Sequence, residues 1–245
     1  MKHFLVGIIL LSAMLLLIAC TGTRRFGTTV ERDEKNPCQT NIVVQLGVQG
    51  TQADVDAIKK DLDECYKIEC FNACPGDSNK GCKTHFSYVI KLWGSLNEEE
   101  QHAFHYVRMV DEDGMPSTAY LGTPNAPPDT YKECVWRRNQ PRGVYCHEVL
   151  HLCGLEDEYC SRVYDPVLDS LIVEHVCDPP PDPGTNCCTP FPGNRRCSTP
   201  CNGHEDDIMA NTEVPLTCMN IHKVLKGAGL DNCPAECCRS GKTFT

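Results

Sequence analysis

The most specific pattern in this chain is His147-Glu148-Val149-Leu150-His151-Leu152-Cys153-Gly154-Leu155-Glu156-Asp157. Two histidines four positions apart share one face of a helix, so both imidazoles can bind one metal ion. Glu148 lies one position further round the helix, beside the metal rather than among its ligands. Gly154 is expected to end the helix, because glycine adopts the left-handed conformation at low cost. The chain then turns back and lets Asp157 supply a third ligand, and zinc with three protein ligands and one open position is the catalytic arrangement.

The helix that carries these histidines is expected to be buried, because Val149, Leu150 and Leu152 are apolar. Two imidazoles and a carboxylate in a buried helix need compensation, which a metal ion provides. The alternative is a surface helix with two ordinary histidines and a solvated glutamate.

Other residues compete with Asp157 for the third ligand position. The spacing from Gly154 favours Asp157. The competitors are His175 and His204 in the following segment, and Glu156 and Glu158 on either side of Asp157.

The pattern His-Glu-x-x-His-x-x-Gly-x-x-Asp resembles the signature of the metzincin clan of zinc endopeptidases, and its aspartate version resembles the small secreted snapalysin-type proteases. Residues 154–159, Gly-Leu-Glu-Asp-Glu-Tyr, are similar to the Gly-Leu-Ala-Asp-Glu-Tyr run of the bacterial IgA-peptidase family, whose spacing is one residue longer. Residues 207–210, Asp-Ile-Met-Ala, match the methionine turn of the clan, with Met209 as its methionine. The chain departs from the clan in having Asp157 as the third ligand and Asn211 where some members have a tyrosine ligand.

This resemblance implies an α+β, zincin-like fold: a twisted mixed β-sheet, an active-site helix, a methionine turn and a C-terminal helix. It also implies a zinc endopeptidase that holds one Zn²⁺ by His147, His151 and Asp157, with Glu148 as general base and proteins or peptides as substrates. Tyr159 either supports Asp157 or the oxyanion, or simply packs.

Two other functions remain open. One is a non-catalytic zinc-binding surface lipoprotein, against which the intact Glu148 argues. The other is a zinc amidase that acts on cell-wall peptides.

The N-terminus is expected to be a bacterial lipoprotein signal. Residues 1–19 contain an apolar core too short for a comfortable membrane span, and Leu17-Ile18-Ala19-Cys20 resembles a lipobox in which Cys20 is lipidated. Because Thr21 follows Cys20, the signal resembles the outer-membrane class, which predicts a lipid-anchored protein of the bacterial cell envelope. The alternatives are a plain secretory signal and an uncleaved anchor. Residues 20–36 are polar and are expected to form a flexible tether, so that 37–245 is a single catalytic domain.

The cysteine content predicts an exported, disulfide-rich protein. The chain has 19 cysteines, and an even number remains once Cys20 is set aside. Two pairs, Cys74 with Cys82 and Cys197 with Cys201, are expected to close small loops. Cys146 and Cys153 are expected to tie the active-site helix to its neighbours. The formal net charge of −10 argues against nucleic acid as a partner, and the oligomeric state is left open.

Hydrophobic periodicity predicts the remaining elements. Strands are expected at 41–47, 85–93, 104–110, 117–122 and 132–137, and helices at 53–66 (with Thr51 as N-cap), 143–153 and 213–227. Residues 70–82 are expected to form a loop. In the insert 160–205, proline and cysteine are expected to replace regular structure.

Overall fold

The computed structural model describes residues 24–25, 27–74, 76–111, 134–156, 159–165, 170–175, 196–201, 206–209 and 211–239, with only the backbone of 24–25, 77–79 and 159–200. The signal at 1–19, Cys20, the predicted strand at 117–122, Asp157 and His204 lie outside these residues. Within them, no helix is both long and apolar enough to cross a membrane.

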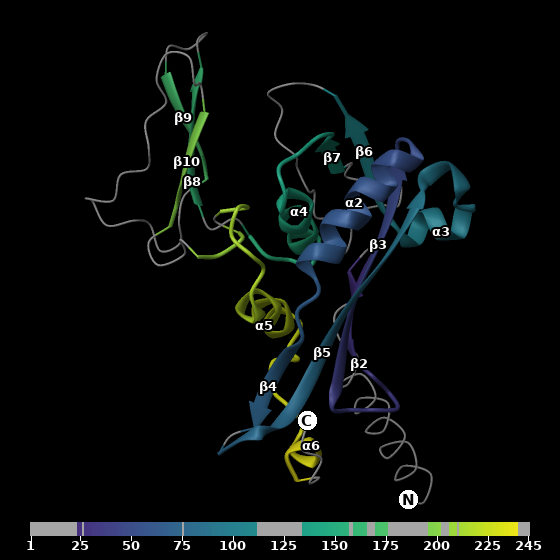
Figure 1. Cartoon of the computed structure of the whole chain (residues 1–245), viewed down its shortest axis with the longest axis vertical. Helices are drawn as coiled ribbons and strands as arrows, with labels where there is room; N and C mark the ends of the chain where they lie inside the picture. The colour runs from purple at the N-terminus through teal and green to yellow at the C-terminus, as the bar shows by residue number, and fades with distance from the viewer. Residues whose placement is uncertain are drawn as a thin grey trace, which may run out of the picture.

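The protein has a mixed, curled β-sheet at its centre, which confirms the expected α+β class (Figure 1). Strand β3 pairs in parallel with β5 on one side. On its other side it pairs antiparallel with β2 over its first half and in parallel with β6 over its second half. The strands of this sheet are β1 (Arg24–Arg25), β2 (Thr28–Arg32), β3 (Gln39–Gln49), β4 (Cys70–Cys74), β5 (Asp77–Leu92), β6 (His105–Val110) and β7 (Cys134–Arg137).

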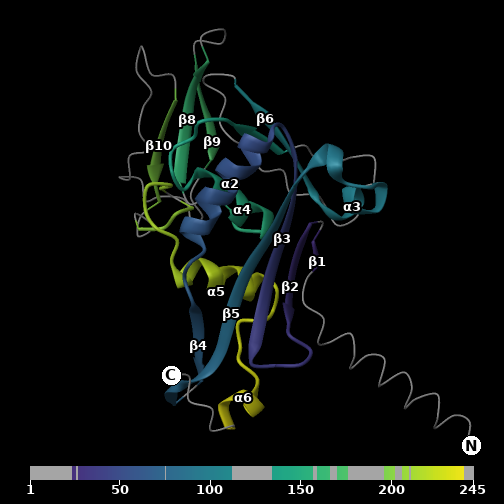
Figure 2. The same ribbon diagram turned by 45° about the vertical axis from the view of Figure 1, so that its right-hand side comes forward.

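Strand β3 contributes to the core because apolar residues occur at every second position from 42 to 48. Ile42, Val44, Leu46 and Val48 are all fully buried on one face of the strand. The core on that face includes residues of two helices, α2 (Gln52–Cys65) and α4 (Val144–Leu152), which lie side by side in both views (Figures 1 and 2). The active-site helix predicted at 143–153 is therefore a central element of the fold.

Helix α2 begins at the predicted place. Thr51 caps it, and Thr51 and Asp54 form a reciprocal capping box. Val55, Ile58 and Leu62 are buried at helical spacing, as the periodicity predicts. The strands predicted at 41–47, 85–93, 104–110 and 132–137 are also present as β3, β5, β6 and β7, with shifted ends.

The expected tether at 20–36 is wrong for residues 28–32, which form β2 and pair with Thr40–Val44. Thr28 and Val30 are buried. Strand β2 also pairs the backbone groups of this half of β3, which would otherwise lie unpaired at a sheet edge. The Thr28 hydroxyl also lies 2.8 Å from Nε2 of His105 on β6. Burial lowers the pKa of His105 to about 3, so this ring is neutral at physiological pH. The folded domain therefore begins before Pro37.

The expected loop at 70–82 is also wrong, because β4 and the start of β5 form an antiparallel hairpin there. The hairpin is fixed by disulfides to the C-terminal tail. Cys70 bonds Cys218, Cys74 bonds Cys238 and Cys82 bonds Cys233. The small loop expected from a Cys74–Cys82 bridge is therefore absent.

The insert contains regular structure that the sequence did not predict. Strands β8 (Tyr159–Asp165), β9 (Ser170–His175) and β10 (Arg196–Pro200) form a separate antiparallel sheet in the order β10-β8-β9. This small sheet stands to one side of α4 (Figure 1). The apolar run Leu171-Ile172-Val173, with two β-branched residues, was the available signal, but the proline content of the insert outweighed it.

The C-terminal helix is shorter than predicted. Helix α5 spans Cys218–Gly227 rather than starting at Glu213, because Thr217 and Asn220 form a capping box that sets its first turn. The remaining helical elements are the 3₁₀ turn η1 (Trp93–Ser95), α3 (Glu98–Ala103) and α6 (Ala235–Arg239).

Removing β2 should destabilise the domain. A soluble form that starts at Pro37 should unfold roughly 5 °C or more below a form that starts at Thr21, because losing the burial of Val30 alone costs about 1.5–3 kcal/mol. Thermal unfolding monitored by circular dichroism measures the difference. Equal midpoints for the two forms would show that β2 adds nothing to the fold.

Candidate metal centre

Helix α4 is buried along its length. Val149, Leu150 and Leu152 have no exposed surface, and His147 and Glu148 are each 5% exposed. The alternative of a solvated surface helix is therefore wrong. A disulfide between Cys146 and Cys65 ties α4 to α2, as expected for Cys146. Cys153 is also buried, but it belongs to none of the five bridges between described cysteines.

The start of α4 depends on a glycine and on a carboxylate from another helix. Gly143 has φ +86°, and a Cβ atom there would lie 2.3 Å from the carbonyl oxygen of Thr212. Glycine has no side chain with which to cap the helix. Instead, the Gly143 N–H donates to Oδ1 of Asp61 on α2 at 3.0 Å. Sequence reasoning missed Asp61, because a cap supplied by a distant helix leaves no local pattern.

The end of α4 confirms the role predicted for Gly154. This residue has φ +98°, its N–H donates to the His151 carbonyl, and the Leu155 N–H donates to the Leu150 carbonyl. These two bonds form a Schellman motif, which reverses the chain. The reversal brings the Leu155 carbonyl oxygen to 2.9 Å from Nδ1 of His151. The glycine stop thus also orients a histidine of the predicted site.

The two histidines are held in the same way. Nδ1 of His147 lies 2.9 Å from the carbonyl oxygen of Ile208, just as Nδ1 of His151 lies near that of Leu155. A carbonyl oxygen only accepts hydrogen bonds, so each Nδ1 must carry a proton. In a neutral ring this leaves a lone pair on Nε2.

Those two Nε2 atoms lie 3.0 Å apart, with the rings almost perpendicular at 89°. Two lone pairs at this distance repel one another unless a metal cation or a shared proton lies between them. Two imidazole nitrogens bound tetrahedrally to one zinc at about 2.0–2.1 Å are separated by roughly 3.3 Å. The donor set could therefore hold zinc, and imidazole also suits copper, iron and nickel.

The predicted methionine turn, residues 207–209, contacts α4 at His147. Ile208 and Met209 have no exposed surface and belong to the hydrophobic core. Through the Ile208 carbonyl, this segment contacts the ring of His147. The sequence predicted a role for Met209, but it did not identify Ile208 as the residue that contacts the ligand.

Two further predicted residues are placed by their backbone alone. Tyr159 begins β8, and His175 ends β9 in register with Ser161. His175 and Tyr159 therefore lie at the same end of the small sheet. Asp157 and His204 fall outside the described residues, so the choice of Asp157 as third ligand stays a prediction.

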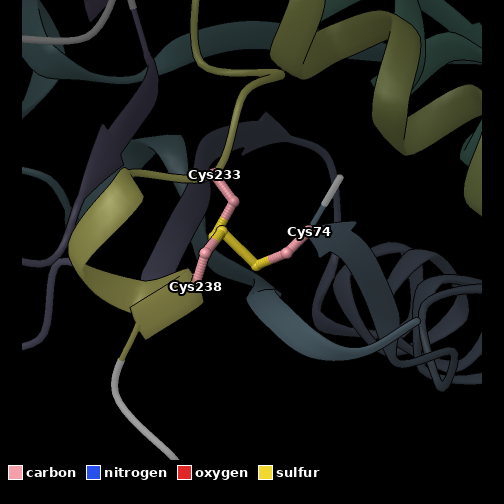
Figure 3. A group of neighbouring side chains, drawn as sticks. All are labelled: Cys74, Cys233 and Cys238. Carbon is pink, nitrogen blue, oxygen red and sulfur yellow. A yellow bond between two sulfur atoms is a disulfide. The ribbon is translucent and has the colours of Figure 1, made fainter. Parts of the chain in front are cut away.

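Among the described residues, three other groups of side chains have ligand atoms close together, but all include disulfide sulfur. They are Cys74 with Cys233 and Cys238, Cys82 with Cys233 and Cys237, and Asp61 with Cys65 and Cys146. Every one of these cysteines is in a disulfide, and Figure 3 shows the first group with its Cys74–Cys238 bond. A thiolate is required to bind a metal. In the oxidised protein these groups are covalent crosslinks.

No protein-family model, curated protein or solved structure matches this chain. The interpretation of the site therefore depends on its own geometry.

The Asp61 cap makes a prediction about stability and pH. Burial raises the pKa of Asp61, although the backbone N–H of Gly143 acts in the opposite direction. A raised folded-state pKa means that the stability linked to this group is fully present below the unfolded value and is lost as pH rises through the folded value. Asp61→Asn keeps an acceptor for Gly143 but does not titrate. The free energy of unfolding of this variant should therefore not show the decrease with rising pH that is linked to Asp61. Asp61→Ala should lose the cap, about 1 kcal/mol.

Urea unfolding of the parent and both variants across pH 4–8 measures these effects. Lys59→Met, on the exposed side of α2, is the control, because its ion pair with Asp63 is about half exposed. Identical curves for Asp61→Ala and the parent would contradict the assignment of Asp61 as the cap.

Proposed function

We propose that this protein is a zinc-dependent endopeptidase, with His147 and His151 as two of the metal ligands. The observation that carries the proposal is the pair of Nε2 atoms 3.0 Å apart on a buried helix, with both Nδ1 atoms committed to carbonyl oxygens. The resemblance of residues 147–157 and 207–210 to the metzincin signature supports the same reaction. Asp157, three residues beyond Gly154, is the proposed third ligand.

The proposed roles follow from the chemistry of a zinc-bound water molecule. A bound zinc ion would lower the pKa of a water molecule toward about 7 and polarise a peptide carbonyl. Glu148 would accept the proton of the attacking water and deliver it to the leaving amine. Its burial suits this role, because the low dielectric around α4 strengthens its interaction with a nearby proton or cation.

Both ends of α4 are held in place, which suits a metal site whose ligands must keep fixed positions. The helix is fixed at its start by Asp61 and the Cys65–Cys146 disulfide, and at its end by the Gly154 turn. Preorganised ligands avoid the cost of ordering when metal and substrate bind. We propose further that the enzyme acts on proteins or peptides in the bacterial cell envelope, anchored to a membrane by a lipid on Cys20.

Replacing Glu148 separates metal binding from catalysis. Glu148→Gln keeps the size of the side chain but cannot accept a proton, so cleavage should fall about 10²–10⁴-fold while zinc content is unchanged. The measurement is cleavage of casein or a peptide library, together with metal analysis of the same sample. Glu99→Gln, which changes an exposed carboxylate on α3, is the matched control. A Glu148→Gln variant that cleaves as fast as the parent would exclude Glu148 as the base.

A parent protein that binds zinc but cleaves no polypeptide would contradict the endopeptidase proposal. In that case, peptidoglycan peptides would test the amidase alternative, and inactivity on both substrates would favour a zinc-binding lipoprotein.

A further inference from the structure

The carbonyl group of Ile208 determines which nitrogen of His147 is available to a metal. Because this oxygen accepts the Nδ1 proton at 2.9 Å, the lone pair lies on Nε2. If the Ile208 peptide rotated, Nδ1 would lose its acceptor and the ring could take the other tautomer. The orientation of one peptide group therefore affects metal binding.

Asp207 fixes that peptide group from both sides. Its Oδ1 accepts the Met209 N–H at 2.9 Å, which closes an Asx turn around Ile208. Its own carbonyl oxygen accepts the Asn211 N–H at 2.9 Å. The backbone before and after Ile208 is thus constrained by one residue, which is only 9% exposed.

Helix α5 holds Asp207 in place. The Asn220 side-chain amide donates to Oδ1, and the Lys223 ammonium group lies 2.7 Å from Oδ2. Asn220 is fully buried, and its side-chain oxygen Oδ1 accepts hydrogen bonds from the backbone N–H and the hydroxyl of Thr217. Asn220 therefore connects the capping box of α5 to the turn beneath His147.

This arrangement is costly for a purely structural contact. Removing the Asp207 carboxylate from water costs free energy that its attraction to the partly exposed Lys223 ammonium group often fails to recover. Asn220 also occupies a position of α5 that faces the core, between Leu216 and Val224, where an apolar residue would be expected. A polar network at the base of a predicted metal ligand suggests a role in orienting that ligand.

We propose that Asp207 is a positioning residue for the metal centre. Held by Asn220 and Lys223, its carboxylate fixes the Ile208 carbonyl, which keeps His147 in the tautomer whose Nε2 can bind zinc. The inference rests on the proposed function, which supplies the zinc site. It adds that α5 contributes to metal affinity without contacting the metal.

The test compares four variants of the oxidised full chain: Asp207→Ala, Asp207→Asn, Lys223→Met and Lys226→Met. Lys226 is exposed on the same helix and is the matched control for Lys223. Zinc affinity is measured by competition with a chromophoric chelator. The His147 tautomer is measured in the metal-free protein from the ¹⁵N chemical shifts of its imidazole, which a merely structural role for Asp207 would leave unchanged.

Asp207→Ala should weaken zinc binding about 10–100-fold and give His147 a mixture of tautomers. Asp207→Asn keeps the acceptor for Met209 and should stay closer to the parent in both measurements. Lys223→Met should weaken zinc binding several-fold, whereas Lys226→Met should change neither.

If Asp207→Ala folds with unchanged zinc affinity and tautomer, the inference is wrong. If it does not fold, Lys223→Met decides the question, and behaviour identical to Lys226→Met would overturn the inference. Failure of the proposed function looks different: the parent would bind no zinc or cleave nothing. The tautomer measurement would still test the link between Asp207 and His147, because it needs no metal.

Discussion

The site depends on two hydrogen bonds between imidazole nitrogens and backbone carbonyl oxygens. Ile208 holds His147, and Leu155 holds His151, each through Nδ1 at 2.9 Å. Each bond fixes a tautomer, and together they leave two Nε2 atoms with lone pairs 3.0 Å apart. Without a cation between them these lone pairs repel, and with a zinc ion the two nitrogens would be two of the three proposed ligands.

Several contacts around α4 hold those carbonyl groups and imidazole rings in fixed positions relative to one another. Gly154 reverses the chain so that Leu155 reaches His151, and α5 holds the turn that brings Ile208 to His147. The helix itself is fixed by Asp61, by the Cys65–Cys146 disulfide and by close packing in the core. Crosslinks between the β4–β5 hairpin and the C-terminal tail anchor the segment that carries α5. The disulfide framework thus supports the same helix as the polar network.

The sequence predicted the parts of this structure that leave a local pattern. Helical periodicity and the Thr51 cap identified α2, and the Gly154 stop was correct because left-handed geometry has few substitutes. Contacts between distant segments left no such pattern. Asp61 caps a helix some 80 residues away, as its bond to Gly143 shows, and β2 is ordered by pairing with β3 and by the contact of Thr28 with His105 on β6. Cysteine partners followed tertiary position rather than spacing, so the loop expected between Cys74 and Cys82 became a hairpin crosslinked to the tail. Asn220, a polar residue on an apolar helix face, was the one overlooked signal of the network beneath His147.

Metal analysis of the purified protein tests the central claim most directly. The oxidised full chain, dialysed against trace zinc, should contain one zinc ion per chain, and the variant with both His147→Ala and His151→Ala should contain none. Mass spectrometry under native conditions, with elemental analysis of the same sample, gives both numbers. A parent chain that binds no metal, or a double variant that still retains its zinc, would contradict the account.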